Sequence, residues 1–209
     1  MKQLVLLLCL ISQFNYAQSS EEKDLIIQAE QFQQKGDLEN AIKTSKEIMK
    51  LNPKSYEAAN SIAGYYGLMG KFNDEIIWAE KSVTINPKFC PGYINLGNGY
   101  VGNGDYEKAT LYFRKAKEAD PASPFPPYSL GVMEENKENF QSAITYYEES
   151  VKLDKNFENG YYNLAAMYAL TKDFEKANKN IQKVLELNPN AEDAKEMQQH
   201  ILQEINQKQ

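Results

Sequence analysis

The chain has 209 residues, with 23 Lys and Arg against 29 Asp and Glu, and its formal net charge is −6 at pH 7. Binding to phosphate backbones relies on clustered Lys and Arg, whereas Arg114 is the only arginine here. We therefore expect no nucleic-acid partner.

The first residues have the pattern of a secretory signal peptide. Lys2 is followed by an apolar run over residues 4–11, and the small residue Ala17 stands before Gln18. A short basic start, a core of about 7 to 15 apolar residues and a small residue at the cut mark such a peptide. The run is shorter than the roughly 20 apolar residues of a membrane-spanning helix. We expect residues 1–17 to be removed, the protein to be periplasmic or secreted, and the mature chain to have no transmembrane segment.

Cys9 leaves a second interpretation open, because a lipoprotein signal places lipid on a cysteine at the cleavage point. However, Leu7 and Leu8 precede Cys9 where small residues are expected, and the apolar run continues past it. The secretory signal peptide is therefore the favoured interpretation. After its removal Cys90 is the only cysteine, so no intramolecular disulfide can form and packing must hold the fold together.

Beyond residue 22 the chain repeats with a constant period, which equals the spacing from Gly36 to Gly70 and from Gly70 to Gly104. Each period reads as two helices joined by a turn, and we expect the first pair at about residues 22–35 and 38–51. Gly36-Asp37 ends the first helix, because glycine accepts the left-handed backbone that closes a helix. Asn52-Pro53 stops the second, because proline lacks an amide donor. Similar helix-ending pairs return at Gly70-Lys71, Gly104-Asp105, Asn86-Pro87, Asp120-Pro121 and Asn188-Pro189.

Small residues recur at two phases of the period, while Tyr, Phe and Leu occupy the neighbouring phases, a pattern that lets helices approach closely. The small residues are Ala63, Gly97, Gly131 and Ala165 on the first helices, and Ala41, Ala109, Ala143 and Ala177 on the second helices. Glu75 departs from the alanine phase, and Glu134 stands where an aromatic residue recurs. We interpret both as local changes of packing that leave the fold intact.

This pattern resembles the tetratricopeptide repeat family. The resemblance implies an all-α fold, a right-handed solenoid of about five helix-turn-helix repeats. These would be residues 22–55, 56–89, 90–123, 124–157 and 158–191. A further amphipathic helix within residues 192–209 is expected to cap the last repeat, because the end of a solenoid otherwise exposes an apolar face meant for a neighbour.

The sequence contains none of the motifs that commonly mark an enzyme. There is no HExxH pair, no CxxC motif, no nucleophile elbow and no GxxxxGK[ST] phosphate loop. Cys90 reads as a small buried residue, and His200, the only histidine, reads as a surface residue. We therefore expect a binding protein rather than an enzyme, with no metal and no cofactor.

The resemblance also implies a binding surface, because the first helix of each repeat lines a concave groove in tetratricopeptide folds. The residues that this register assigns to a peptide-binding groove are Asn60, Ile94, Asn95, Asn98, Tyr128, Tyr162 and Asn163. Asparagine amides both donate to and accept from a peptide backbone, and tyrosine offers broad contact at low entropic cost. The family's clamp for C-terminal carboxylates needs Lys and Arg at such positions, so we do not expect that binding mode.

A second candidate interface consists of Trp78, Tyr112 and Tyr146, which recur with the same period on the second helices. Two function hypotheses follow. The leading one is an exported scaffold that binds a peptide segment of an envelope or secreted partner in the groove. The alternative is an accessory subunit of a cell-envelope enzyme or secretion complex, docked through its convex face. No motif identifies the partner or the oligomeric state.

Overall fold

The computed structural model describes residues 20–207 and places them in helices joined by short turns, without a strand. The all-α fold expected from the sequence is therefore confirmed. Within the same range, no helix is both long enough and apolar enough to cross a membrane. The expected signal peptide and the alternative at Cys9 lie outside the described residues and stay predictions.

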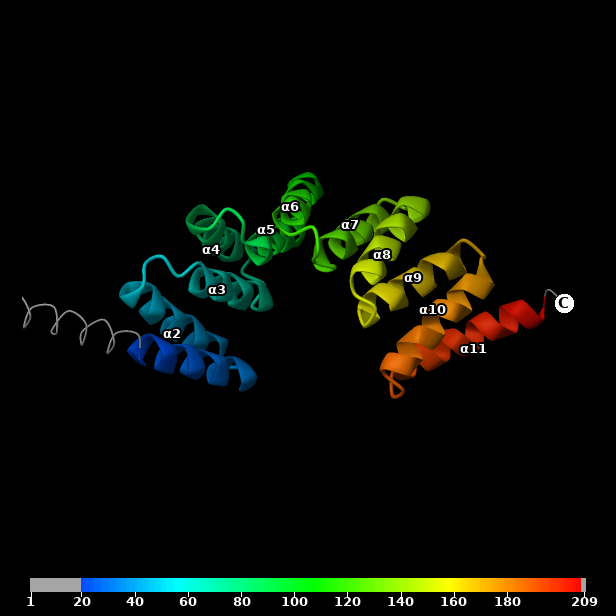
Figure 1. Ribbon diagram of the computed structural model, residues 1–209, viewed down its shortest axis with the longest axis horizontal. Helices are drawn as coiled ribbons and strands as arrows, with labels where there is room; N and C mark the ends of the chain where they lie inside the picture. Colours follow the sequence, from blue (N-terminus) through cyan, green and yellow to red (C-terminus); the bar gives the residue numbers. More distant parts are fainter. Residues whose placement is uncertain (1–19, 208–209) are drawn as a thin grey trace, which may run out of the picture. The chain divides into compact units, whose positions relative to one another are not determined.

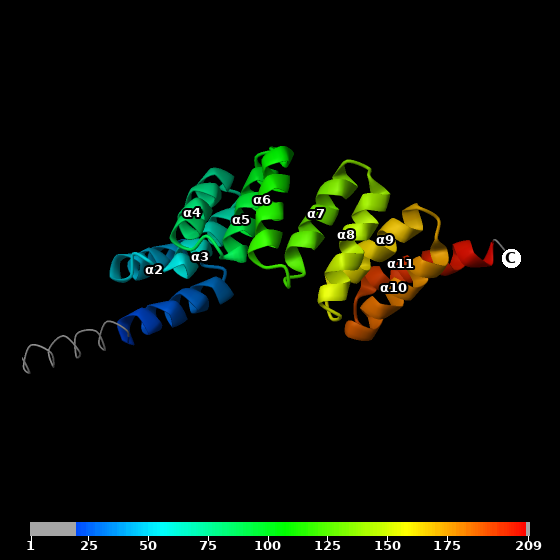
Figure 2. The ribbon, with the colours of Figure 1, turned by 45° about the horizontal axis from the view of Figure 1, so that its top comes forward.

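The helices divide into two compact units, one ending at Ala109 and the other starting at Thr110. Figures 1 and 2 show the helices of each unit. The first unit contains a helix over residues 20–34, α2 (Leu38–Leu51), α3 (Tyr56–Leu68), α4 (Phe72–Ile85), α5 (Cys90–Gly102) and the start of α6 (Tyr106–Ala119). The second contains the rest of α6, α7 (Phe125–Asn136), α8 (Phe140–Leu153), α9 (Glu158–Leu170), α10 (Phe174–Leu187) and α11 (Glu192–Asn206).

The turn between the two helices of a pair has a left-handed backbone residue in all five periods. The φ angle is 73° at Gly36, 69° at Gly70 and 77° at Gly104, and it is 60° at Glu138 and 62° at Lys172. Glycine adopts this conformation without steric cost, whereas a residue with a Cβ loses about 1 kcal/mol or more. Packing of the helix pair therefore imposes the turn even where the sequence lacks glycine.

Three second helices begin with an aspartate cap directly after this turn. The carboxylates of Asp37, Asp105 and Asp173 each accept a hydrogen bond from the backbone N–H three residues further on, at 3.1 to 3.3 Å. Such a bond satisfies one of the free amides at the start of a helix. In these three periods, the left-handed residue of the turn is thus followed directly by an aspartate that caps the next helix.

Each unit has its own core, made of the alanines of the repeat and the large residues beside them. In the first unit, Ala41, Ala59 and Ile62 are inaccessible to solvent, and α3 packs against α2, α4 and α5. In the second unit, α11 packs against α10 and contributes two fully buried side chains, Ala194 and Ile201, to the core. The apolar side of the last helix pair is therefore covered.

Candidate functional site

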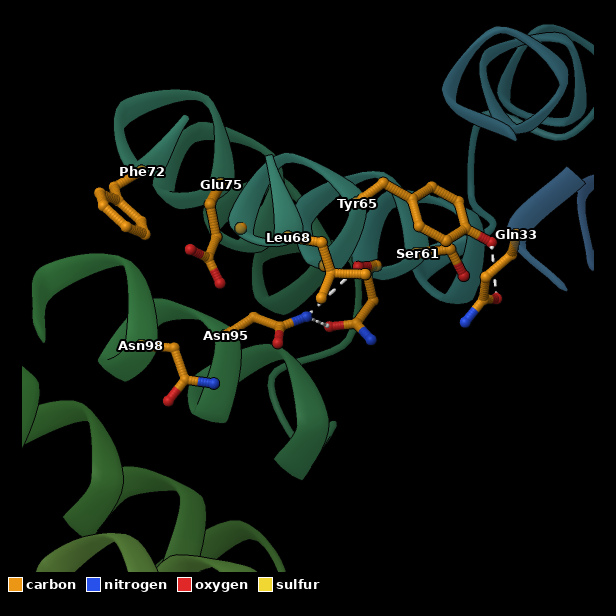
Figure 3. A pocket seen from close by; sticks show the side chains of 11 residues that line it. Gln33, Ser61, Tyr65, Leu68, Phe72, Glu75, Asn95 and Asn98 are labelled. Carbon is orange, nitrogen blue, oxygen red and sulfur yellow. Dashed lines mark hydrogen bonds between the residues drawn. The ribbon is translucent and has the colours of Figure 1, made fainter. Parts of the chain in front are cut away.

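A pocket of about 480 Å³ lies in the first unit, across the first helices of three successive pairs. It is lined by Gln33 from the helix over residues 20–34, by Asn60, Ser61, Gly64, Tyr65, Gly67 and Leu68 from α3, by Phe72 and Glu75 from α4, and by Asn95 and Asn98 from α5. Figure 3 shows Glu75 directed from α4 toward the side chains of Asn95 and Asn98. The pocket thus combines one carboxyl group with several amides.

The amides form a partly connected set of donors and acceptors. The Asn95 side-chain amide donates to the Oδ1 of Asn60 at 2.9 Å and to its backbone oxygen at 3.3 Å. Opposite them, the Tyr65 hydroxyl donates to the Oε1 of Gln33 at 3.1 Å. Asn98 is exposed, and so is Leu68, with 69% of the residue's surface accessible. The pocket therefore offers an amide and an apolar contact directly to solvent.

Glu75 is buried at this site, with 3% of its surface exposed. The residues one period away in either direction, Ala41 and Ala109, are fully buried alanines. Among the lining residues drawn in Figure 3, none is joined to the Glu75 carboxyl group by a hydrogen bond. A buried carboxylate without partners is costly. Burial accordingly raises the pKa of Glu75 to about 7.

One glycine makes room for the glutamate. A Cβ placed on Gly67 would lie 2.7 Å from the Glu75 carboxyl group. A Cβ on Gly99 would instead lie 2.7 Å from the Cγ1 of Ile76 and in ordinary contact, at 3.5 Å, with the Cγ of Glu75. The residue one period before Gly67 is the larger Gln33. The extra bulk of Glu75 is therefore matched by bulk missing at position 67.

In the second unit, the predicted groove residues Tyr128 and Asn163 belong to a hydrogen-bonded cluster. The Asn163 amide donates to the hydroxyl oxygens of Tyr128 and Tyr147, at 3.3 Å each. The Tyr147 hydroxyl in turn donates to the Oε2 of Glu135 at 2.6 Å. Burial, followed by the bond to Glu135, raises the pKa of Tyr147 above its usual range. These groups satisfy one another, so the cluster contributes to the packing of the second unit.

Tyr128 also has ring contacts that a free groove residue would lack. Its ring meets Phe157 edge-on with centroids 5.2 Å apart, and it lies 5.6 Å from the ring of Tyr147. Such pairs add to stability beyond the area that they bury. Substitution of Tyr128 would consequently disturb the fold and any binding together.

The structure brings some of the predicted groove residues together and leaves others apart. Asn60, Asn95 and Asn98 line the same pocket. Ile94 is half-buried and does not line it, and Tyr162 packs against the core of the second unit. Sequence reasoning missed the contributions of Gln33, Tyr65, Leu68 and Glu75. The signal was present at Glu75, because it interrupts an alanine phase.

The residues of the second candidate interface are half-buried, and a lysine ammonium group lies over each ring. Lys81 lies 4.8 Å from the ring centroid of Trp78, Lys115 lies 5.1 Å from that of Tyr112, and Lys117 lies 5.7 Å from that of Tyr146. A cation over an aromatic face is attracted by the ring quadrupole. The aromatic faces are thus partly covered by the chain's own side chains.

No other chemistry converges in the part of the chain that the structure describes. Residues 20–207 contain no group of three His, Cys, Asp or Glu side chains placed to hold a metal ion. Cys90 is buried, and His200 on α11 is exposed. The pocket around Glu75 is therefore the candidate site with the most distinctive chemistry.

Three segments of the chain match family models described as tetratricopeptide repeat: residues 90–123, 128–157 and 158–191. The small glutamine-rich tetratricopeptide repeat-containing protein 2 of Mycosarcoma maydis is 26% identical over 103 residues, which are 49% of this chain and 29% of that protein. The matched segment thus spans less than a third of that relative.

Solved structures with the same fold include TTC0263, a thermophilic TPR protein of Thermus thermophilus. It is 20% identical, with a TM-score of 0.73 that covers 87% of this chain and 98% of that one. YrrB, described as a TPR protein with an unusual peptide-binding site, is 18% identical, with a TM-score of 0.58 over 84% of this chain and 90% of that one. These likenesses show an all-α repeat solenoid fold.

Proposed function

We propose that this chain, which contains tetratricopeptide repeats, is an exported scaffold that binds an extended peptide segment of an envelope or secreted partner. The observation that carries the proposal is the pocket across three first helices, where Asn60, Asn95 and Asn98 lie together. Tetratricopeptide repeat proteins act in protein–protein interaction, and the protein similar in fold, YrrB, is described with a peptide-binding site. Export is supported by the pattern of residues 1–17.

The pocket has the two kinds of contact that a peptide needs. Amide groups can donate to peptide carbonyls and accept from peptide N–H groups, and the exposed Asn98 is placed to do so without breaking an existing contact. Leu68 supplies an apolar surface at the same place, with 69% of the residue's surface exposed. A peptide bound in the pocket would cover this apolar group together with the neighbouring amides.

A matched pair of substitutions tests the proposal. Leu68 lines the pocket, whereas Leu170 stands three periods later, at the same phase in the second unit, and is 59% exposed. Tagged residues 18–209 would be mixed with the envelope fraction of the source cells, and retained proteins would be quantified by mass spectrometry. Leu68→Ser should reduce the retained partner strongly, and Leu170→Ser should do so less.

The alternative function predicts another result. If the chain is an accessory subunit docked through Trp78 and Tyr112, then Trp78→Ala and Tyr112→Ala should release the partner, while Leu68→Ser retains it. That outcome would replace the peptide-binding proposal. We propose no catalytic role, and turnover of a substrate by the purified chain would contradict this.

Export is tested by the N-terminus of the mature protein. Mass spectrometry of protein recovered from the envelope or medium should give a start at or near Gln18. Retention of Met1 would refute the signal peptide, and a lipid on Cys9 would instead establish the lipoprotein alternative.

A further inference from the structure

We propose that the pocket around Glu75 binds a basic side chain of the partner peptide, a lysine or an arginine, through the Glu75 carboxylate. This inference rests on the proposed function and names the chemical class of side chain that the pocket would bind. It is carried by three observations on the first unit: a space cleared for the carboxyl group, the lack of a partner for that group, and an apolar contact beside it.

The cleared space involves two positions of the repeat at once. Glu75 stands where the other periods have an alanine, and Gly67 stands where they have larger side chains, namely Gln33, Val101, Glu135 and Ala169. With a methyl group on Gly67, the carboxyl group could not hold its position, because the separation would be 2.7 Å. The glutamate and the glycine that accommodates it therefore occur together in this repeat alone.

The carboxyl group has no internal cation to neutralise it. Among the pocket residues only Tyr65 and Glu75 are titratable, and the rest of the lining is neutral. Glu30 adds a negative charge near Tyr65, since after burial it contributes to raising the pKa of Tyr65. A carboxylate inside a protein is stabilised by pairing with a cation. The unmet requirement of Glu75 is thus a positive charge from outside.

A lysine or arginine side chain matches the rest of the pocket. Its methylene stem can pack on Leu68 while its charged head reaches inward, the usual arrangement for long basic side chains. The ammonium group of lysine has three donors, so it can bond the Glu75 carboxylate and also amide oxygens such as that of Asn98. The net charge of −6 on the whole chain favours approach of a basic segment as well.

Ion pairing at Glu75 would also release protons. Burial raises the pKa of Glu75 in the free protein to about 7, so part of the population carries a proton there near neutral pH. A bound ammonium group stabilises the carboxylate and lowers this pKa. Binding should therefore tighten as the pH rises from 6 toward 8, which the titration of Tyr65, whose pKa is raised by burial, cannot explain.

Two blocked pentapeptides provide the probes, acetyl-AAKAA-amide and the same peptide with norleucine in place of lysine. Each would be titrated into ¹⁵N-labelled residues 18–209, wild type and Glu75→Gln, while the side-chain amide signals of Asn60, Asn95 and Asn98 are followed by NMR. The lysine peptide should bind the wild type at least about tenfold more tightly than the norleucine peptide, as expected for a charge-assisted bond. The Glu75→Gln variant should lose this preference.

A measurement on the wild type alone guards against misfolding of the variant. The carboxyl carbon of Glu75 would be titrated by ¹³C NMR with and without the lysine peptide, and its pKa should fall when the peptide is present. Equal binding of both peptides, or a pKa that stays or rises, overturns the inference. The proposed function is judged separately, because it stands as long as partner retention depends on Leu68.

Discussion

The buried carboxyl group of Glu75 predicts an unusual dependence of stability on pH. The perturbation is Glu75→Gln, which keeps the shape of the side chain and removes its charge. In the wild type the pKa of this group rises from an ordinary 4.5 to about 7 on folding. Between these values the native state binds more protons than the unfolded state, so the free energy of unfolding falls as the pH rises.

The size of the effect follows from the shift. One pKa unit corresponds to about 1.4 kcal/mol, so the shift sets an upper limit of about 3 kcal/mol on the stability lost between pH 4.5 and 8. The true value will be lower, because the carboxyl group faces a pocket that is open to solvent. Glu75→Gln should therefore gain about 1 to 3 kcal/mol relative to the wild type on going from pH 4.5 to pH 8.

Trp78 provides the assay, because it is the only tryptophan and lies on α4, the helix that carries Glu75. Urea unfolding at several pH values, followed by its fluorescence, reports on the first unit. Glu80→Gln is the matched control, since it removes one charge from the same helix at an exposed position. If the stability difference between Glu75→Gln and wild type changes with pH no more than that for Glu80→Gln, the argument from burial is refuted.

Three further predictions concern the stability of the repeats, through two buried serines, two turn residues and the last helix. Ser150 has a buried hydroxyl without a partner, whereas the equivalent Ser82 donates to a backbone oxygen at 2.9 Å; Ser150→Ala should be neutral or stabilising in thermal unfolding, and Ser82→Ala should cost about 1 kcal/mol. Glu138→Gly should raise the melting temperature, because glycine relieves the strain of the left-handed turn. Gly104→Ala should lower the melting temperature and cost about 1 kcal/mol in the free energy of unfolding. Equal effects of the two substitutions would contradict the strain argument. Deletion of residues 192–209 removes α11 with its fully buried Ile201 and uncovers the core against which α11 packs. It should lower the free energy of unfolding, measured by chemical denaturation, by at least about 3 kcal/mol. Unchanged unfolding would show that α11 does not cap the repeat.

Helix positions could be read from the sequence because they depend on local signals that recur once in every period. Gly36 and Gly104 permit the left-handed turns, and Asn52-Pro53 ends a helix by its own chemistry. Glu138 and Lys172 lack the glycine and still adopt the turn. The period therefore predicted the turns at these two positions, whereas the conformational preferences of glutamate and lysine would not have done so.

The site was harder to predict because it depends on relations between distant residues. The register of the first helices identified Asn60, Asn95 and Asn98, which do share a pocket. The role of Glu75 depends instead on side-chain volume missing at Gly67, which is not adjacent to it in sequence. Tyr128 was assigned to the groove by phase alone, which carries no information about its packing against Phe157.

The exchange of volume around Glu75 couples this residue to position 67. A methyl group at position 67 would come within 2.7 Å of the carboxyl group, so the glutamate side chain would have to move away. With alanine at position 75 no carboxyl group stands in the way, and a methyl group at position 67 would instead fill part of a cavity. Gly67→Ala should accordingly be tolerated better in a Glu75→Ala background than in the wild type. The effects of the two substitutions on stability should therefore not be additive, which a double-mutant cycle would measure.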